Sequence, residues 1–500
     1  MNDSPSASGV LYGLDDVPPN GKAVVLSLQH VLTMCGSTVA VPLLLGPPMG
    51  MDTAQIALLI SSVMFCSGVA TLIQSTIGSR LPIIQGVSFS FLAAFFMIIA
   101  AVHPSESAEP ASAEPTVVLE ETAPAGAAMP YIAGAVMVGA ALEMIIGFSG
   151  AMGWIRKVLS PVVVGPVIML IGLALYQAGA PIAASHWPIA ILTVAGIAVF
   201  SFVLAPRSTV FRLFPMLLAI IVAVAACALG SMVGWFTGDH PAKPNLDAFG
   251  QAAWIRTTDV IFPWGLPKFD TGFIVAVAAG YLASMIESFG DYHACKQMAG
   301  GGDPTPEEIS RGIGCEGIGC ALTGVFGGFS STSYSENVGL IGLTKVGSRR
   351  VVQIAAVILI FLGLFGKFGA LAAAIPQPVV GGLYCAMFGL ISAVGIRQFA
   401  RCDLNSDRNL FVGGLSLFMG LSVPYYFQNG GSDAVSAAFP SGIDAVINSI
   451  GQTGMAVAAI LGIALDNLIP GTLSERGLEE DVEIDPSPGD EVTEAVVTPS

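Results

Sequence analysis

Apolar stretches of about 20 residues recur along the whole chain, separated by short segments rich in Gly, Pro and charged residues. Clear examples are residues 23–45, 273–294 and 351–374. A helix of about 20 residues crosses the ~30 Å hydrocarbon core of a bilayer. The pattern therefore predicts an all-α polytopic membrane protein. It predicts about 14 spans, which begin near residues 23, 53, 83, 129, 158, 185, 212, 271, 309, 333, 349, 376, 408 and 443.

Two of these spans are too short and too polar for ordinary membrane helices. Residues 82–91 and 329–340 begin with β-branched or hydroxyl residues and reach polar Gln85 or Glu336 just before a short apolar helix. Extended backbone at membrane depth is tolerated only when it is buried in protein or faces a watery cavity. The two are the third and tenth spans, so we expect a 7+7 inverted repeat. In it, spans 3 and 10 contain short β-strands followed by half-helices, and a midplane binding site lies between them.

The composition agrees with a membrane protein, because 54% of the residues are hydrophobic and 11% are charged, against roughly a quarter charged in soluble domains. With the N-terminus inside, most of the 19 Lys and Arg residues fall on the cytoplasmic side. That bias follows the positive-inside rule. It predicts a multi-pass protein of the cell membrane, plasma or inner, with both termini in the cytoplasm.

The net charge of −16 arises mainly from two acidic segments, the loop at 103–129 and the tail at 469–500. Both are poor in apolar residues, so we expect solvated, disordered segments. The 8 cysteines are scattered through apolar stretches without a paired spacing. They are expected to be small core residues, with no metal site. No nucleophile elbow, zinc-protease or phosphate-loop motif occurs, which argues against an enzyme.

Ionisable residues inside the apolar spans are few, and each is costly if it faces lipid. They are His30, Glu143, Glu287, Asp291, Glu316 and Glu336, with Lys345 at the inner end of the tenth span. Glu287 and Asp291 are four residues apart, so both project from one helix face. These positions predict a polar cavity. For Glu143 a hydrogen bond between helices is favoured over a place in the site.

The segment from Ser335 to Arg350, SENVGLIGLTKVGSRR, resembles the long motif of the nucleobase-ascorbate transporter family, also called the second nucleobase-cation symporter family. Other motifs of that family are matched in the same order by Gln29-His30, by QGVSFSF at 85–91, by ESFGDY at 287–292 and by Glu316-Gly317. The resemblance runs from about residue 22 to residue 470 and implies a transporter for a small substrate.

The resemblance also implies a division of the chain into a core domain and a gate domain that move against each other like an elevator, usually in a homodimer formed through the gate. The expected parts are a cytoplasmic tail (1–21), core spans 1–4 (22–150), gate spans 5–7 (151–240), an outer loop (241–270), core spans 8–11 (271–374), gate spans 12–14 (375–468) and the acidic tail (469–500).

By the same resemblance, Glu287 and Glu336 would accept hydrogen bonds from the ring N–H groups of a base. Phe89 and Tyr334 would flank the ring. The expected substrate-binding set also includes Ser88, Asn337 and Gly339. Candidates for coupling to H⁺ or Na⁺ are Asp291, Glu316 and His30, although Glu316 is equally expected as a structural acceptor for hydroxyl donors. Gln29, Gln85, Thr344 and Lys345 are expected to support the motifs.

The residue at position 336 bears on the substrate. In the family, Glu at this place is similar to the uracil carriers, Gln to the xanthine and urate carriers, and Pro to the ascorbate carriers. A carboxylate accepts hydrogen bonds and repels anions, which argues against ascorbate. Uracil is therefore the expected substrate, with xanthine or another oxopurine as an alternative, and no cofactor or nucleic acid is expected. A second hypothesis is an anion carrier or channel of the related 14-span architecture, which would need a positive field at the midplane.

Overall fold

The computed structural model describes residues 10–103, 123–153, 158–440 and 443–478. Most of the acidic loop and of the acidic tail, predicted to be disordered, lies outside these residues. The first half of the chain contains α1 (Asn20–Leu45), α2 (Thr53–Thr76), β1 (Gln85–Val87), α3 (Leu92–Val102), α4 (Met129–Ser149), α6 (Pro161–Leu173), α7 (Tyr176–Ala183), α8 (Trp187–Ala198), α9 (Thr209–Leu213) and α10 (Pro215–Met232).

The second half begins with a connection that the sequence predicts as a loop and that contains the short helix α11 (Asp247–Gln251). It continues with α12 (Thr271–Met298), α13 (Pro306–Phe326), β2 (Ser331–Ser333), α14 (Ser335–Thr344), α15 (Arg349–Leu364), α16 (Gly366–Ala373), α17 (Gln377–Phe399), α18 (Asp407–Tyr426), α19 (Ser432–Ala438), α20 (Ile443–Gln452) and α21 (Gly454–Leu468).

The helical, multi-span character predicted from hydropathy is confirmed. Among the described residues, nine helices are long and apolar enough to cross a membrane, or up to eleven if each sharply bent pair is one span. The bent pairs are α15 with α16, at 77°, and α20 with α21, at 94°. The predicted total of about 14 also counts α3, α13 and α14, which are shorter or more polar than these spans.

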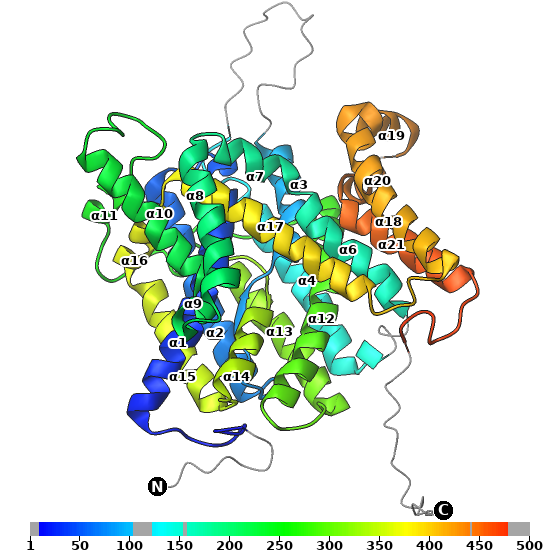
Figure 1. Ribbon diagram of the computed structural model, residues 1–500. Coiled ribbons are helices and arrows are strands. Elements are labelled where there is room, and N and C mark those ends of the chain that lie inside the picture. The colour runs from blue at the N-terminus through cyan, green and yellow to red at the C-terminus, as the bar shows by residue number, and fades with distance from the viewer. Residues whose placement is uncertain (1–9, 104–122, 154–157, 441–442, 479–500) are drawn as a thin grey trace, which may run out of the picture.

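The packing of the helices follows the same plan in the two halves (Figure 1). Helix α4 packs on α13, and α2 packs on α15 in the corresponding way; likewise α1 packs on α15 and α12 on α4. Farther along the chain, α8 packs on α10 as α18 packs on α21. Each of these pairs has its counterpart seven spans away, which is the relation that an inverted repeat imposes.

Two extended segments cross at the centre of this helix assembly. Strands β1 and β2 pair antiparallel, with Gln85 opposite Ser333, Gly86 opposite Thr332 and Val87 opposite Ser331. The hydrogen bonds from Tyr334 N to the Ile84 carbonyl and from Ser88 N to the Ser330 carbonyl, both 3.0 Å, extend the pairing at each end. No water is available in a bilayer core to satisfy backbone polar groups. Each broken span therefore supplies hydrogen-bond partners to the backbone of the other. The half-helices α3 and α14 start directly after this crossing.

The C-terminal end of α14 is held by the N-terminal segment, which the sequence predicts to be a cytoplasmic tail. Lys345 ends α14 in a left-handed conformation, with φ 57°. Its carbonyl accepts a hydrogen bond from Leu11 N at 2.8 Å, and Gly347 N donates to the Tyr12 carbonyl at 2.7 Å. Both ends of this half-helix are therefore fixed, which positions its first turn.

Helix α4 approaches α13 so closely that the backbones touch. A Cβ atom added to Gly147 would lie 2.2 Å from the Gly314 backbone nitrogen, and one added to Gly317 would lie 2.9 Å from the Ala140 carbonyl oxygen. Since backbone atoms on a packed helix cannot move aside independently, these glycines are required by close approach rather than by backbone conformation.

We expect Gly147→Ala to lower the melting temperature of the detergent-purified protein by several degrees, because overpacking costs about 1–3 kcal/mol. Gly414→Ala in α18 is the matched control, since an added Cβ there meets nothing within 4 Å and Ala is the better helix former. It should leave thermal unfolding unchanged or raise its midpoint. Equal midpoints for the two variants would contradict the backbone contact.

Candidate functional site

Glu287 and Glu336 lie on facing elements at the strand crossing. Glu287 is half-buried on α12, whereas Glu336 is in the first turn of α14 and exposed. They are close enough to interact electrostatically. No described group donates a hydrogen bond to Glu287, and the one side chain that donates to Glu336 is Ser37, at 3.4 Å. Both carboxylates therefore keep acceptor capacity for a ligand.

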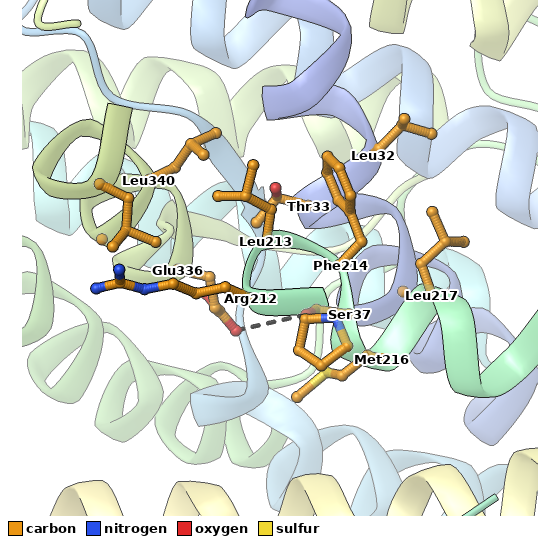
Figure 2. A pocket seen from close by; sticks show the side chains of 14 residues that line it. Leu32, Thr33, Ser37, Arg212, Leu213, Phe214, Met216, Leu217, Glu336 and Leu340 are labelled. Carbon is orange, nitrogen blue, oxygen red and sulfur yellow. Dashed lines mark hydrogen bonds between the residues drawn. The ribbon is translucent and has the colours of Figure 1, made fainter. Parts of the chain in front are cut away.

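A cavity of about 380 Å³ reaches Glu336, within the size range typical of small-molecule sites, roughly 300–1,000 Å³. It is formed by α1, α14 and the α9–α10 corner, so the two parts predicted as core and gate both line it (Figure 2). Its lining residues are Leu32, Thr33, Gly36, Ser37, Arg212, Leu213, Phe214, Pro215, Met216, Leu217, Glu336, Gly339, Leu340 and Leu343. Of the predicted substrate-binding residues, this cavity contains Glu336 and Gly339.

Glu316 is a buried acceptor surrounded by hydroxyl donors from α12. Ser284 donates to its carboxylate at 3.1 Å, Ser288 at 2.7 Å and Tyr292 at 2.9 Å. These contacts are the ones expected if Glu316 is a structural acceptor for hydroxyl donors, one of the two roles predicted for it. It ties α13 to α12 beneath the strand crossing, because a buried charge needs such hydrogen bonds to be tolerated.

Asp291 is also saturated by hydroxyl donors, in this case from the second broken span. Ser333 donates to Oδ2 at 2.8 Å and Ser335 donates to Oδ1 at 2.7 Å. The side chain is 8% exposed. Asp291 therefore lies between the open carboxylate Glu287, one helical turn away, and the strand β2.

His30 is a buried histidine with a partner. Asn337 Nδ2 lies 3.1 Å from His30 Nδ1 and donates to the His30 carbonyl at 3.0 Å, so α14 is pinned to α1. The Asn337 Oδ1 atom is buried without a hydrogen-bond partner in the described protein. His30 consequently meets a neutral amide here rather than a carboxylate.

The two aromatic residues expected to flank the substrate have different environments. The Tyr334 ring lies against Gly86, where an added Cβ would come within 2.4 Å of it. Its hydroxyl bonds Thr38 and the Val87 carbonyl, so this ring belongs to the packed crossing. Phe89 is half-buried and packs against two separate apolar clusters of the core. Ser88 is buried and caps the short turn before α3 by accepting from Ser90 N.

The motif residues fall into two groups. Gln85 is wholly buried with both side-chain amide atoms unpaired, and Gln29 has a buried unpaired Oε1, within the described protein. Such groups are rare in native interiors and mark places where a ligand or water completes the hydrogen bonds. Thr344 bonds the Leu340 carbonyl within its helix, and Lys345 ends α14, so both have structural positions.

The prediction that Glu143 hydrogen-bonds between helices is wrong. Glu143 is on α4 and faces α13, but neither carboxylate oxygen has a partner of hydrogen-bond geometry in the described residues. The polar group that α13 places near Glu143 is the Cys320 thiol, a weak donor. Arg212 is a residue that sequence reasoning missed, because nothing in its local sequence indicates that α9 folds back to line the cavity beside Glu336.

Comparison with known sequences gives a consistent picture. The xanthine/uracil permease model, described as a permease family, matches residues 21–429. The human solute carrier family 23 member 2 is 37% identical over 505 residues, covering 95% of this chain and 77% of that protein. Nucleobase-ascorbate transporter 2 of Arabidopsis thaliana is 34% identical over 492 residues, covering 94% of this chain and 90% of its own length.

Solved structures show a similar fold at much lower sequence identity. The murine Slc26a9 anion transporter in its inward-facing state has a TM-score of 0.58 and 12% identity, over 91% of this chain and 69% of that one. The transmembrane domain of the cyanobacterial bicarbonate transporter BicA has a TM-score of 0.50 and 12% identity, over 89% of this chain and 98% of that one. Both support the fold and nothing finer.

Access through the cavity can be tested with cysteine labelling in a Cys385→Ser background, which removes the one exposed native thiol of the described chain. An added Cβ at Gly339 meets nothing within 4 Å, whereas Val338 is 3% exposed. We expect Gly339→Cys to react with a small thiol reagent at least about tenfold faster than Val338→Cys, because reactivity requires exposure. Similar rates would mean that the cavity does not open to solvent.

Proposed function

This chain belongs to the nucleobase-ascorbate transporter family of membrane permeases, and we propose that it imports a nucleobase, with uracil preferred over xanthine or another oxopurine. The observation that supports this proposal most is the pair of open carboxylates. Glu287 has no hydrogen-bond donor among the described groups, and Glu336 has a single weak side-chain donor. The other two carboxylates of the region are filled by hydroxyl groups.

An acceptor pair of this kind suits the polar edge of a base. Uracil and the oxopurines present ring N–H donors flanked by carbonyl acceptors, and a hydrogen bond to a carboxylate is about twice as strong as a neutral one. At the start of α14 the Asn337 and Val338 N–H groups donate to the Tyr334 carbonyl, which leaves the Ser335 N–H for a carbonyl oxygen of the substrate. An anionic substrate such as ascorbate would be repelled by Glu287 and Glu336.

We further propose that uptake is coupled to H⁺ or Na⁺, with Asp291 and Glu316 as the acidic groups concerned. His30 is the weaker candidate, since its ring is engaged with Asn337. The cavity separates α1 and α14 from α9 and α10, so a core that slides against a gate would open and close it.

The proposed membrane is the cell membrane, with the termini in the cytoplasm, and the proposed assembly is a homodimer through the gate. Helices α8, α10 and α18 support the proposed homodimer, because few of their residues are buried within the described chain. In the most apolar 18-residue stretch of each span, 22%, 28% and 22% of the residues are buried. That surface faces lipid or a second gate. The anion-carrier alternative is not favoured, because the open carboxylates Glu287 and Glu336 would repel an anion.

Uptake into proteoliposomes tests the proposed function. The purified protein should accumulate labelled uracil, xanthine or hypoxanthine when either a proton or a sodium gradient is imposed. Unlabelled base should compete, while ascorbate and bicarbonate should not. Absence of accumulation of every base, with either gradient, would rule out the proposal.

Two substitutions test the carboxylate pair. Glu287→Ala should abolish base binding, measured as loss of ligand-induced thermal stabilisation, while leaving the melting temperature of the free protein nearly unchanged. Glu336→Gln should weaken uracil binding by about tenfold, equivalent to about 1.4 kcal/mol, and should shift preference toward xanthine because an amide both donates and accepts.

Glu307→Gln is the control for these variants. Glu307 is likewise in the first turn of a helix, but it is exposed and outside the cavity. Its replacement should leave affinity within about twofold, the scale of a surface charge change. If Glu336→Gln behaved like Glu307→Gln in both affinity and selectivity, Glu336 would not be part of the binding site.

A further inference from the structure

The segment formed by residues 10–16, which we call the strap, lies parallel to the chain at the C-terminal end of α14 and pairs with it (Figure 1). Leu11 N and Tyr12 N donate to the Lys345 carbonyl at 2.8 and 3.4 Å, and Gly347 N donates to the Tyr12 carbonyl at 2.7 Å. The strap therefore binds the backbone directly after the half-helix that carries one carboxylate of the site.

Further contacts continue the strap along the start of α15. Arg349 N donates to the Leu14 carbonyl at 3.1 Å, and the Ser348 hydroxyl donates to the Asp16 carbonyl at 2.5 Å. Asp15 forms an ion pair with Arg349. Because α14 ends and α15 begins at this point, the strap fastens the two helices together.

The Leu14 side chain anchors the strap in the protein interior. It packs against an apolar cluster that includes Val338 and Ile341 of α14. It also reaches the α12–α13 connection, where an added Cβ at Gly301 would lie 2.8 Å from Leu14 Cδ1. The strap is thus bound to the surroundings of α14 by packing as well as by backbone hydrogen bonds.

Lys345 has a backbone conformation that depends on such contacts. Its φ is 57°, in the left-handed region that residues other than Gly, Asn and Asp rarely occupy. A residue of this kind persists only where its surroundings fix it. The Lys345 side chain is exposed, whereas its carbonyl receives both strap N–H groups. The strap therefore stabilises a strained helix end.

Helix α14 needs support at both ends because it is short. It spans 10 residues, Ser335–Thr344, and isolated helices shorter than ~12–15 residues are marginal in water. The strand crossing and the contact between Asn337 and His30 hold its first turn, and the strap holds its last. Leu340 and Leu343 in its second half line the cavity, so loosening that half would also change the cavity wall.

A stiff link joins the strap to the opposite wall of the cavity. Pro18 and Pro19 lie between the strap and α1, which begins at Asn20, and proline fixes φ at about −65°. Helix α1 carries Ser37, which lines the cavity and donates to Glu336. The strap is continuous with one wall and bonded to the other, so it fixes their relative position.

We propose that the strap sets the substrate affinity of the site: docked, it holds α14 where Glu336 can accept a hydrogen bond from the substrate, and undocked, it leaves a low-affinity site. This inference rests on the proposed function and adds positioning residues that do not touch the substrate. Lys345 and Glu336 are about 13 Å apart along the helix axis, at ~1.5 Å per residue. A rigid α14 therefore carries the effect of docking to its first turn.

Two replacements of Leu11 separate the backbone contact from the side chain. Leu11→Pro removes the N–H that bonds the Lys345 carbonyl, whereas Leu11→Ala keeps that N–H and shortens a side chain that is 52% exposed. Base affinity is measured on the full-length purified protein from ligand-induced thermal stabilisation. The ligand is uracil, or xanthine if xanthine binds more tightly.

We expect Leu11→Pro to weaken base binding at least about fivefold, as when the docked fraction falls to about a fifth. Leu11→Ala should stay within about twofold, as for other surface substitutions. Without base, the backbone amides of residues 341–347 should exchange with deuterium at least about fivefold faster in Leu11→Pro than in Leu11→Ala, because undocking exposes them.

A second substitution tests the strain at Lys345. Gly adopts positive φ without steric cost, and it commonly ends helices in this conformation. Lys345→Gly, added to Leu11→Pro, should therefore restore base affinity to within about twofold of the wild-type value. Lys345→Ala is the matched control, because it removes the same side chain but keeps the strain, so it should not restore affinity.

Three results would overturn the role of the strap. They are equal base affinities of Leu11→Pro and Leu11→Ala, faster deuterium exchange in Leu11→Pro without a change in affinity, and equal restoration by Lys345→Gly and Lys345→Ala. In each of them the wild-type protein still binds a base. Failure of the proposed function would differ, since no base would then stabilise the wild-type protein, and the proposed control of affinity would fall with it.

Discussion

The crossing of β1 and β2 is the constraint on which the rest of the site depends. Extended backbone inside a membrane protein must find its hydrogen bonds within the protein, and here each broken span supplies them to the other. Gly86 allows the close approach, since a side chain there would collide with the Tyr334 ring. The crossing places the start of α14, and with it Glu336, opposite α12. It also turns the hydroxyl groups of β2 toward Asp291 and Ser288.

The same crossing divides four nearby carboxylates into two kinds. Asp291 and Glu316 are filled by hydroxyl donors from α12, β2 and the first residue of α14, while Glu287 and Glu336 are left open. The four carboxylates therefore differ in how many further hydrogen bonds they can accept. Those without protein donors can bind the N–H edge of a ligand, and those filled by serine hydroxyls hold α12, α13 and β2 together. In this account, binding and coupling are adjacent because one strand, β2, borders both pairs.

The sequence predicts the helices and the two broken spans, but it does not predict which side chains meet across them. Hydropathy places the starts of α2, α4, α12 and α15 at their observed residues, because span length and helix punctuation are local properties. Broken spans also show locally as hydroxyl-rich segments. The contacts between side chains cannot be recognised from local sequence. Nothing local indicates that Ser288 meets Ser333, that Arg212 lines the cavity, or that Glu143 lacks a donor. Those facts depend on which helix faces which, and that is decided by packing between distant segments.

The central claim is that Glu287 and Glu336 together receive the N–H edge of a base. A cryo-EM structure of the protein with bound uracil, or with xanthine if that binds more tightly, tests this most directly. The account predicts ring nitrogens within about 2.7–3.0 Å of a carboxylate oxygen of each residue, with Asp291 still bonded to Ser333 and Ser335. A base bound elsewhere, or held by its carbonyl oxygens against Arg212 with both carboxylates unoccupied, would contradict it.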